Sequence, residues 1–120
     1  MGGKIYDLEN RTLEFSKRVL DMTRVLPKDS ANNNFIGQII RSSSSVGANY
    51  REANDALGKK DFIHRIKISR KESKETTYWL ELIVYHNPNL EKRMQNLMKE
   101  SIELTKILSA IINSSQSKES

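Results

Sequence analysis

The sequence predicts an all-α protein, an antiparallel up-down-up-down four-helix bundle formed as one domain by residues 1–120. Apolar residues recur at alternating spacings of three and four along four segments, which is the pattern of helix faces turned to a core. The connections between these segments are short, and no stretch shows the strict alternation of a β-strand. At about 1.5 Å per residue the four helices are about 30 to 40 Å long, so they can pack along one another.

The first helix is predicted over residues 8–26 and ends because Pro27 follows it. Its core-facing residues are Leu8, Thr12, Phe15, Val19, Met22 and Leu26. Residues 27–34 are polar and contain three consecutive asparagines, so they are predicted to form a loop whose last residue, Asn34, caps the second helix.

The second helix is predicted over residues 35–57, with Gly58 as the left-handed residue that follows its C-terminus. Its core-facing residues are Ile36, Ile39, Ser43, Val46, Tyr50, Ala53 and Leu57. The third helix is predicted over residues 60–86, because the Asn-Pro-Asn of residues 87–89 cannot continue it. Its core-facing residues are Phe62, Ile66, Ser69, Ser73, Thr76, Leu80 and Ile83.

The fourth helix is predicted over residues 90–112, and the polar tail of residues 113–120 is expected to fray. Its core-facing residues are Leu90, Met94, Leu97, Ser101, Leu104, Leu108 and Ile111. Small and hydroxyl residues at core positions of the second and third helices predict that these two helices approach closely. Tyr78, Trp79 and Tyr85 then lie on the flanks of the bundle, where they can cover a neighbouring subunit, so a homo-oligomer is expected.

The composition, with 37% hydrophobic and 29% charged residues, is typical of a soluble helical protein. The absence of cysteine excludes disulfides and thiolate chemistry. No apolar run approaches the roughly 18 residues needed to cross a bilayer, and the N-terminus lacks the apolar block of a signal peptide. A cytoplasmic protein with no membrane partner is therefore expected.

A line of basic residues carries much of the net charge of +5. Residues 59–71 contain six bases and one acid. Helical spacing places four lysines and a histidine of residues 60–74 on the face of the third helix opposite its core. The candidate nucleic-acid-binding residues are Lys60, His64, Lys67, Lys71, Lys74 and the neighbouring Arg70. Like charges at contact spacing are mildly destabilising, and RNA or DNA would relieve this repulsion. The alternative is a helix face that is merely solvated.

A second polar line lies on the second helix, away from its apolar face, at spacings of three and four. It consists of Gln38, Arg41, Ser45, Asn49 and Glu52. The hypothesis is a subunit contact in which Arg41 pairs with a carboxylate and Ser45 and Asn49 bridge backbones. The alternative is again a solvated face, although such a face more commonly carries Glu, Lys and Ala.

No arrangement of residues typical of an enzyme is evident, and no metal or cofactor is expected. Asp61 and His64 have the spacing of half of a di-metal site, but the second half is missing, and His86 lies about 33 Å further along the same helix. Glu72 and Glu75 are interpreted as partners of nearby bases on the helix surface, such as Arg70, Lys71 and Lys74.

Two segments, RSSSSVGANYREAN from residue 41 and KKDFIHRIKISRKESKETTYWLEL from residue 59, resemble a bacterial four-helix-bundle family. This family is named after proteins encoded in 23S ribosomal RNA intervening sequences. The likeness spans about residues 8–112. The positions that match its motifs are Arg41, Ser45, Val46, Asn49 and Glu52 on the second helix, and Phe62, Ile66, Ile68, Lys71, Glu72, Glu75, Thr76, Tyr78, Trp79 and Leu80 on the third.

The resemblance implies a ring oligomer, pentameric in known members of the family, which are sometimes labelled ribosomal proteins. A related bundle assists the reverse transcriptase of diversity-generating retroelements through a basic surface. The chain departs from the common pattern at Tyr50, where Ile is usual, and at Ala53, where Gly is common.

The function expected from these observations is a non-enzymatic, oligomeric binding protein that engages RNA or another nucleic acid through its third helix. The alternative is a protein-binding adaptor or structural ring, in which Arg41, Asn49, Glu52 and Trp79 make the contacts and the lysines only solubilise the protein.

Overall fold

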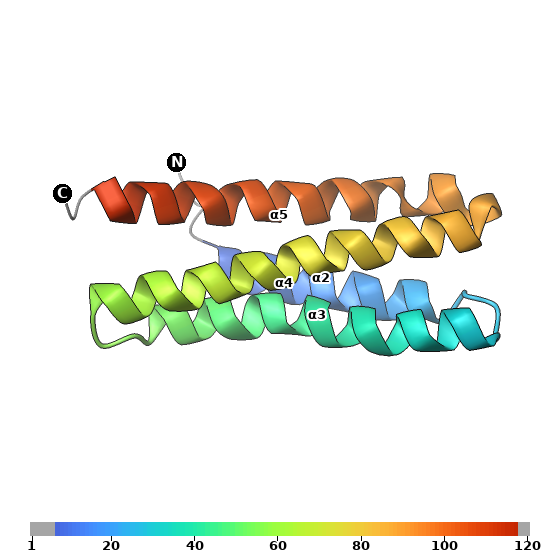
Figure 1. The fold of residues 1–120 in the computed structure, drawn as a ribbon, viewed down its shortest axis with the longest axis horizontal. Helices are drawn as coiled ribbons and strands as arrows, with labels where there is room; N and C mark the ends of the chain where they lie inside the picture. The colour runs from blue at the N-terminus through green and yellow to red at the C-terminus, as the bar shows by residue number, and fades with distance from the viewer. Residues whose placement is uncertain (1–6, 118–120) are drawn as a thin grey trace.

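The computed structural model describes residues 7–117, which form four long α-helices and one short 3-10 helix and contain no strand. The elements are α2 (Leu8–Thr23), α3 (Ser30–Asn54), α4 (Lys59–His86), η1 (Pro88–Leu90) and α5 (Glu91–Ser117). Successive helices run in opposite directions (Figure 1), so the predicted antiparallel all-α bundle is confirmed. The molecule is elongated, with extents of 49 × 28 × 21 Å.

Each helix packs against the helices before and after it in the chain, and α2 closes the bundle against α5. The α3–α4 interface is the most extensive of these contacts, and α4–α5 follows. Helix α2 is much shorter than the other three, so it covers only part of the length of the bundle (Figure 1). Helix α4 takes part in the two most extensive interfaces, with α3 on one side and α5 on the other.

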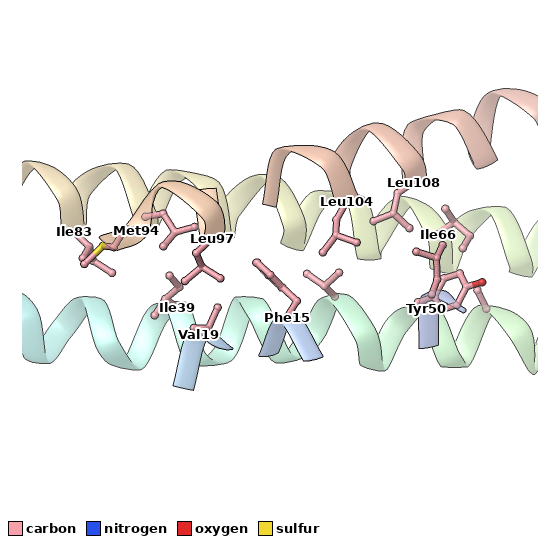
Figure 2. Packing of buried hydrophobic residues seen from close by; sticks show 14 of the residues in the cluster. Phe15, Val19, Ile39, Tyr50, Ile66, Ile83, Met94, Leu97, Leu104 and Leu108 are labelled. Carbon is pink, nitrogen blue, oxygen red and sulfur yellow. The ribbon is translucent and has the colours of Figure 1, made fainter. Parts of the chain in front are cut away.

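The core runs along the axis of the bundle and receives side chains from all four helices (Figure 2). Its largest fully buried members include Phe15 from α2, Ile39 from α3, Ile66 from α4 and Leu104 from α5. These residues belong to the four stripes that the heptad-like spacing predicts, and burial of such side chains stabilises the fold by about 1.5 to 3 kcal/mol each. One stripe residue is misplaced, because Leu57 is fully exposed.

The helix boundaries around the first connection differ from the prediction. Helix α2 ends at Thr23, three residues early, and residues 24–26 form a tight turn of i→i−3 hydrogen bonds that still buries Leu26. Pro27 explains this early end, because a proline disfavours helical geometry in the residue before it.

Helix α3 begins at Ser30, and its N-cap is Asp29, which accepts a hydrogen bond of 2.7 Å from the backbone N–H of Asn32. The prediction of a loop over residues 27–34 capped by Asn34 was therefore wrong. The carboxylate cap, together with a tertiary contact of Asn32, outweighs the low helix propensity of the three asparagines.

That tertiary contact is a pair of buried amides that joins two connections at the same end of the bundle (Figure 1). Asn32 and Asn87 exchange side-chain hydrogen bonds of 3.0 and 2.8 Å. The same amide nitrogens also donate to the backbone carbonyls of Pro27 and Ile83. The α2–α3 connection and the α4–α5 connection are therefore tied to each other through polar groups that are fully satisfied.

The turn between α3 and α4 also differs from the prediction. Helix α3 ends at Asn54 and α4 begins at Lys59, so residues 55–58 form the connection. Gly58 adopts an extended conformation and is the N-cap of α4, and no residue among 7–117 has a positive φ. The predicted left-handed glycine was therefore wrong.

The last helix is longer than predicted at its C-terminal end. Helix α5 begins at Glu91, after η1, and continues through Ser117. Residues 113–117 of the supposedly frayed tail are helical, and Ser117 donates to the carbonyl of Asn113 at 2.8 Å. Residues 118–120 of that tail lie outside the described residues.

Small hydroxyl residues make the predicted close approach of α3 and α4. Ser69 donates to the backbone carbonyl of Val46 at 2.7 Å, and Thr76 donates to Ser42 at 2.8 Å. A side chain as short as serine reaches the carbonyl of a neighbouring helix only when the two backbones lie close together. Between α4 and α5, Ser73 similarly contacts Thr105 at 2.7 Å.

Gly47 allows α3 to approach α2 closely, because it has no side chain. A Cβ atom added there would lie 2.8 Å from Oγ1 and 3.2 Å from Cβ of the buried Thr12. We therefore expect Gly47→Ala to lower the free energy of unfolding by about 1 to 3 kcal/mol, despite the better helix propensity of alanine.

Gly37, on the same helix, provides the control, because a Cβ atom there would meet nothing within 4 Å. Gly37→Ala should raise the free energy of unfolding by about 0.5 to 1 kcal/mol. Urea denaturation of both variants measures the difference. Equal stabilisation by the two substitutions would show that Gly47 does not set the helix spacing.

Candidate functional site

The predicted basic residues lie together on the outer face of α4. Lys60, Lys67, Lys71 and Lys74 are exposed, as is His64. We call these five residues the basic line. The opposite face of α4 is buried against α3 and α5, which fixes the direction in which the basic line points.

Glu75 is a carboxylate neighbour of the basic line, because the charge of Lys71 contributes to the lowered pKa of Glu75. Within residues 7–117, none of the four lysines of this line forms an ion pair. Arg70 differs from them, because it is partly buried on the side of α5 and points its guanidinium toward Ser109 Oγ at 3.5 Å. The geometry therefore leaves four unpaired ammonium groups in one row and places Arg70 at its edge.

The N-terminal part of the basic line borders an open hollow between α4 and α5. The hollow is lined by Lys60, Ile63, His64, Lys67 and Gln116. Two lysines and a histidine therefore surround a depression that an anionic group of a ligand could enter.

The second candidate surface lies where α3 and α4 meet. We call it the α3–α4 surface and define it by Gln38, Arg41, Ser45, Asn49 and Glu52 of α3 with Glu72, Glu75 and Trp79 of α4. Arg41 donates to Glu72 Oε1 at 3.1 Å and also pairs with Glu75. Trp79 donates its indole N–H to Glu75 Oε2 at 3.0 Å.

These contacts correct the interpretation of Glu72 as a partner of bases on its own helix surface, because Glu72 is buried and pairs with Arg41 of the neighbouring helix. Glu75 also pairs with Arg41, but the charge of Lys71 on its own helix acts on it as predicted. Two carboxylates one helical turn apart can each accept a hydrogen bond from one terminal nitrogen of the same guanidinium. The spacing of Glu72 and Glu75 is visible in the sequence, but the register between the two helices is needed to identify Arg41 as their partner.

The electrostatic environment of the α3–α4 surface stabilises its charges. The indole N–H of Trp79 and then Arg41 lower the pKa of Glu75 below its ordinary value, against the effect of partial burial. The hydrogen bond to Glu75 chiefly raises the pKa of Arg41. The surface therefore carries a network of paired charges.

The remaining polar residues of this surface bond within α3. Ser45 donates to the carbonyl of Arg41 at 2.9 Å, and Asn49 donates to the carbonyl of Ser45 at 2.9 Å. Gln38 and Asn49 are half-buried and Glu52 is exposed. Arg41 was expected to pair with a carboxylate at a subunit contact, but Glu72 and Glu75 of the same chain are its partners. The contact between subunits itself stays a prediction.

Aromatic rings extend the α3–α4 surface toward the end of the bundle. Phe35 lies 6.0 to 6.2 Å, between ring centroids, from both Trp79 and His86. His86 in turn lies 3.0 Å from Asp29, the N-cap of α3. The sequence prediction missed both residues at this surface. Phe35 was placed at the start of the second helix rather than one turn inside it, and the partners of His86 come from distant parts of the chain.

A family model described as "23S rRNA-intervening sequence protein" matches residues 6–110. The chain belongs to this family. The match confirms the resemblance carried by the motifs of the second and third helices.

A solved member of the wider group has a very similar fold. It is described as a protein with unknown function from the S23 ribosomal protein family, from Bacteroides thetaiotaomicron VPI-5482. The two chains share 35% sequence identity and superimpose with a TM-score of 0.79, over 87% of this chain and 96% of the other. None of the curated proteins compared with this chain matches it.

The family description and the description of the solved relative name no enzymatic activity. Among residues 7–117, no group of three or more His, Cys, Asp or Glu side chains is arranged to hold a metal ion. In the same range, every helix is too short or too polar to cross a bilayer.

Two carboxylates give the stability of this family member a predicted pH dependence. The backbone N–H of Asn32 and then His86 lower the pKa of Asp29, and the pKa of Glu75 is lowered as described above. A carboxylate with a lowered pKa stabilises the native state above its unfolded pKa of about 4, and this contribution is lost as the pH falls through the native pKa.

We therefore expect the free energy of unfolding to fall below about pH 4 to 5, and Asp29→Asn and Glu75→Gln to weaken this dependence. Asparagine caps a helix about as well as aspartate, so the first variant removes the charge and keeps the cap. Urea denaturation between about pH 3 and pH 7 measures the effect. If the free energy of unfolding depends on pH in the same way for the wild type and both variants, this prediction is wrong.

Proposed function

We propose that this protein is a non-enzymatic binding protein that engages RNA or another nucleic acid through the basic line of α4. The observation that supports the proposal is the row of four exposed lysines without ion-pair partners within residues 7–117, all on helix α4. A nucleic acid carries a series of phosphates, so several of them can contact the lysines of this row at once. Arg70 and Ser109 flank the row on the side of α5.

Contacts of this kind provide affinity but little sequence information, because lysines bind phosphates as point charges. Neutralising four or five phosphates gives a plot of log affinity against log salt with a slope of about −3 to −4.5. Residues other than these four lysines then have to discriminate the natural target from other nucleic acids.

The experiment that tests the proposal is a titration of the full chain against a labelled structured RNA and a matched duplex DNA over a salt series. Binding that weakens with a slope in this range supports the basic line as a nucleic-acid surface. The absence of binding at low salt would refute it and favour the protein-binding adaptor as the function.

We further propose that the α3–α4 surface is a contact between copies of this chain, which assemble as a ring. The Arg41 network and the half-buried Trp79 are typical of an interface, where aromatic residues and arginine are enriched. The pentamer implied by the family resemblance is the expected ring size.

Asn49→Arg should reduce the assembled mass to that of a monomer, because a bulky charge in a packed contact leaves an unpaired buried group. Sedimentation velocity measures this mass. Lys99→Glu on the exposed side of α5 is the control and should leave the assembly intact. A monomeric wild-type protein would contradict the proposal.

A further inference from the structure

The basic line continues along α4 into two exposed tyrosines. Tyr78 follows Lys74 by four residues, Tyr85 follows Tyr78 by seven, and these spacings keep all three on one helix face. The distance along the helix from Lys60 to Tyr85 is about 38 Å. One face of α4 therefore carries a cationic part and then an aromatic part.

The two tyrosine rings are more exposed than an aromatic side chain usually is. Tyr78 is 54% exposed and Tyr85 is 85% exposed, whereas Tyr50 is 9% exposed in the core. Trp79, next to Tyr78 in the chain, is half-buried and donates its indole N–H to Glu75. Tyr78 and Tyr85 thus lie on the basic face, whereas Trp79 belongs to the α3–α4 surface.

Tyr78 is held in place although it is exposed. Its ring meets that of Trp79 edge to face, with 5.4 Å between ring centroids and an interplanar angle of 70°. Trp79 is itself fixed by Glu75 and Phe35. A ring that is oriented before binding loses little conformational entropy when a flat ligand stacks on it.

We propose that the ligand of this face is a single-stranded nucleic acid, whose phosphates lie along the lysines and whose bases stack on Tyr78 and Tyr85. This inference rests on the proposed nucleic-acid-binding function and adds the class of ligand. The bases of a duplex are stacked on one another and present no free face to a tyrosine. The unpaired bases of a single strand stack readily on aromatic side chains.

The charge distribution agrees with this division of the surface. Glu81 lies between the two tyrosines on the same face, at spacings of three and four, and it is exposed. Its carboxylate repels phosphates, whereas it can accept hydrogen bonds from the amino groups of bases. Phosphate contacts are therefore confined to residues 60–74, and base contacts to residues 78–85.

The experiment measures binding of the full chain to three labelled probes of about 20 nucleotides. They are an oligothymidylate, an abasic strand of the same length and a duplex. Base stacking should make the oligothymidylate bind at least about tenfold more tightly than the abasic strand. The double variant Tyr78→Leu, Tyr85→Leu should lose this preference and leave the affinity for the abasic strand unchanged.

The variant Tyr78→Phe, Tyr85→Phe should retain the preference, because phenylalanine keeps the aromatic face. The lysine variant Lys67→Ala, Lys71→Ala, Lys74→Ala should weaken binding of both single strands by similar factors. If the leucine variant binds all three probes as the wild type does, the inference is wrong and the proposed function stands. If no probe binds, the proposed function fails as well.

A third outcome would also overturn the inference. If the leucine variant changes the assembled mass in sedimentation velocity and leaves probe binding unchanged, the tyrosines belong to a contact between protein subunits. Circular dichroism of each variant checks that the helical fold is retained, which exposed side chains make the expected result.

Discussion

Replacing Lys67, Lys71 and Lys74 by alanine should remove most of the nucleic-acid binding of this protein. Each lysine that neutralises a phosphate contributes about 0.7 to 0.9 to the salt slope, so the variant should flatten the slope by about 2 to 3. If the wild type and the variant bind equally at 1 M salt, this difference in slope lowers the affinity of the variant by about a hundredfold or more near 0.1 M salt. Fluorescence anisotropy over a salt series measures both quantities.

The matched control is Lys92→Ala, Lys99→Ala, Lys106→Ala, which removes the same charge from exposed positions of α5. It should change the slope by much less, because those lysines do not lie on the face of α4. An equal effect of the two triple variants would show that only net charge matters and that the basic line is no site.

Thermal unfolding gives this prediction a second readout. The lysines at positions 67, 71 and 74 repel one another at contact spacing, so their removal should leave the fold as stable or slightly more stable, by about 0.2 to 0.5 kcal/mol per pair. A loss of binding that accompanies a loss of stability would point to a structural role instead.

Asn87→Ala should have the largest effect on stability among the polar substitutions. It leaves the side-chain oxygen of the buried Asn32 without its donor and removes a hydrogen bond to the carbonyl of Ile83. A buried polar group without a partner costs about 1 to 3 kcal/mol, so we expect a loss of about 2 to 3 kcal/mol. The Tm should fall by about 10 °C.

The neighbouring Asn89→Ala is the control, because Asn89 is exposed in η1. It should change stability by less than about 0.5 kcal/mol. The double variant Asn32→Ala, Asn87→Ala completes a cycle whose coupling energy should be about 1 kcal/mol or more, because the two amides bond directly. Additive effects of the two single variants would show that the amide pair does not tie the connections together.

The helical fold could be predicted from periodicity because core positions on a helix must recur at three and four residues. This requirement is local, and it identified nearly all the side chains that fill the core, from Leu8 to Leu108. It failed at Leu57 and Gly58, because the path of a turn depends on the elements that it joins. It also failed at residues 30–34, where a cap and a tertiary amide pair decide that asparagines are helical.

The composition of the basic line was evident from the sequence for the same local reason. Lysines that share a helix face can be found by counting, and their exposure follows once the opposite face is buried. The partners of Arg41 could not be found in this way, because Glu72 and Glu75 are 31 and 34 residues away along the chain. Their pairing depends on the register between α3 and α4, which the packing of small hydroxyl residues sets.

The sequence by itself thus determined that four helices form, which of their faces are buried and where the positive charge gathers. These properties follow from the regular repeat of a single helix. Only the tertiary structure decided which distant groups meet: the two amides that join two connections at one end of the bundle, the carboxylates that hold Arg41, and the division of Tyr78 and Trp79 between two surfaces. Such contacts depend on the relative rotation and translation of packed helices, which no local pattern specifies.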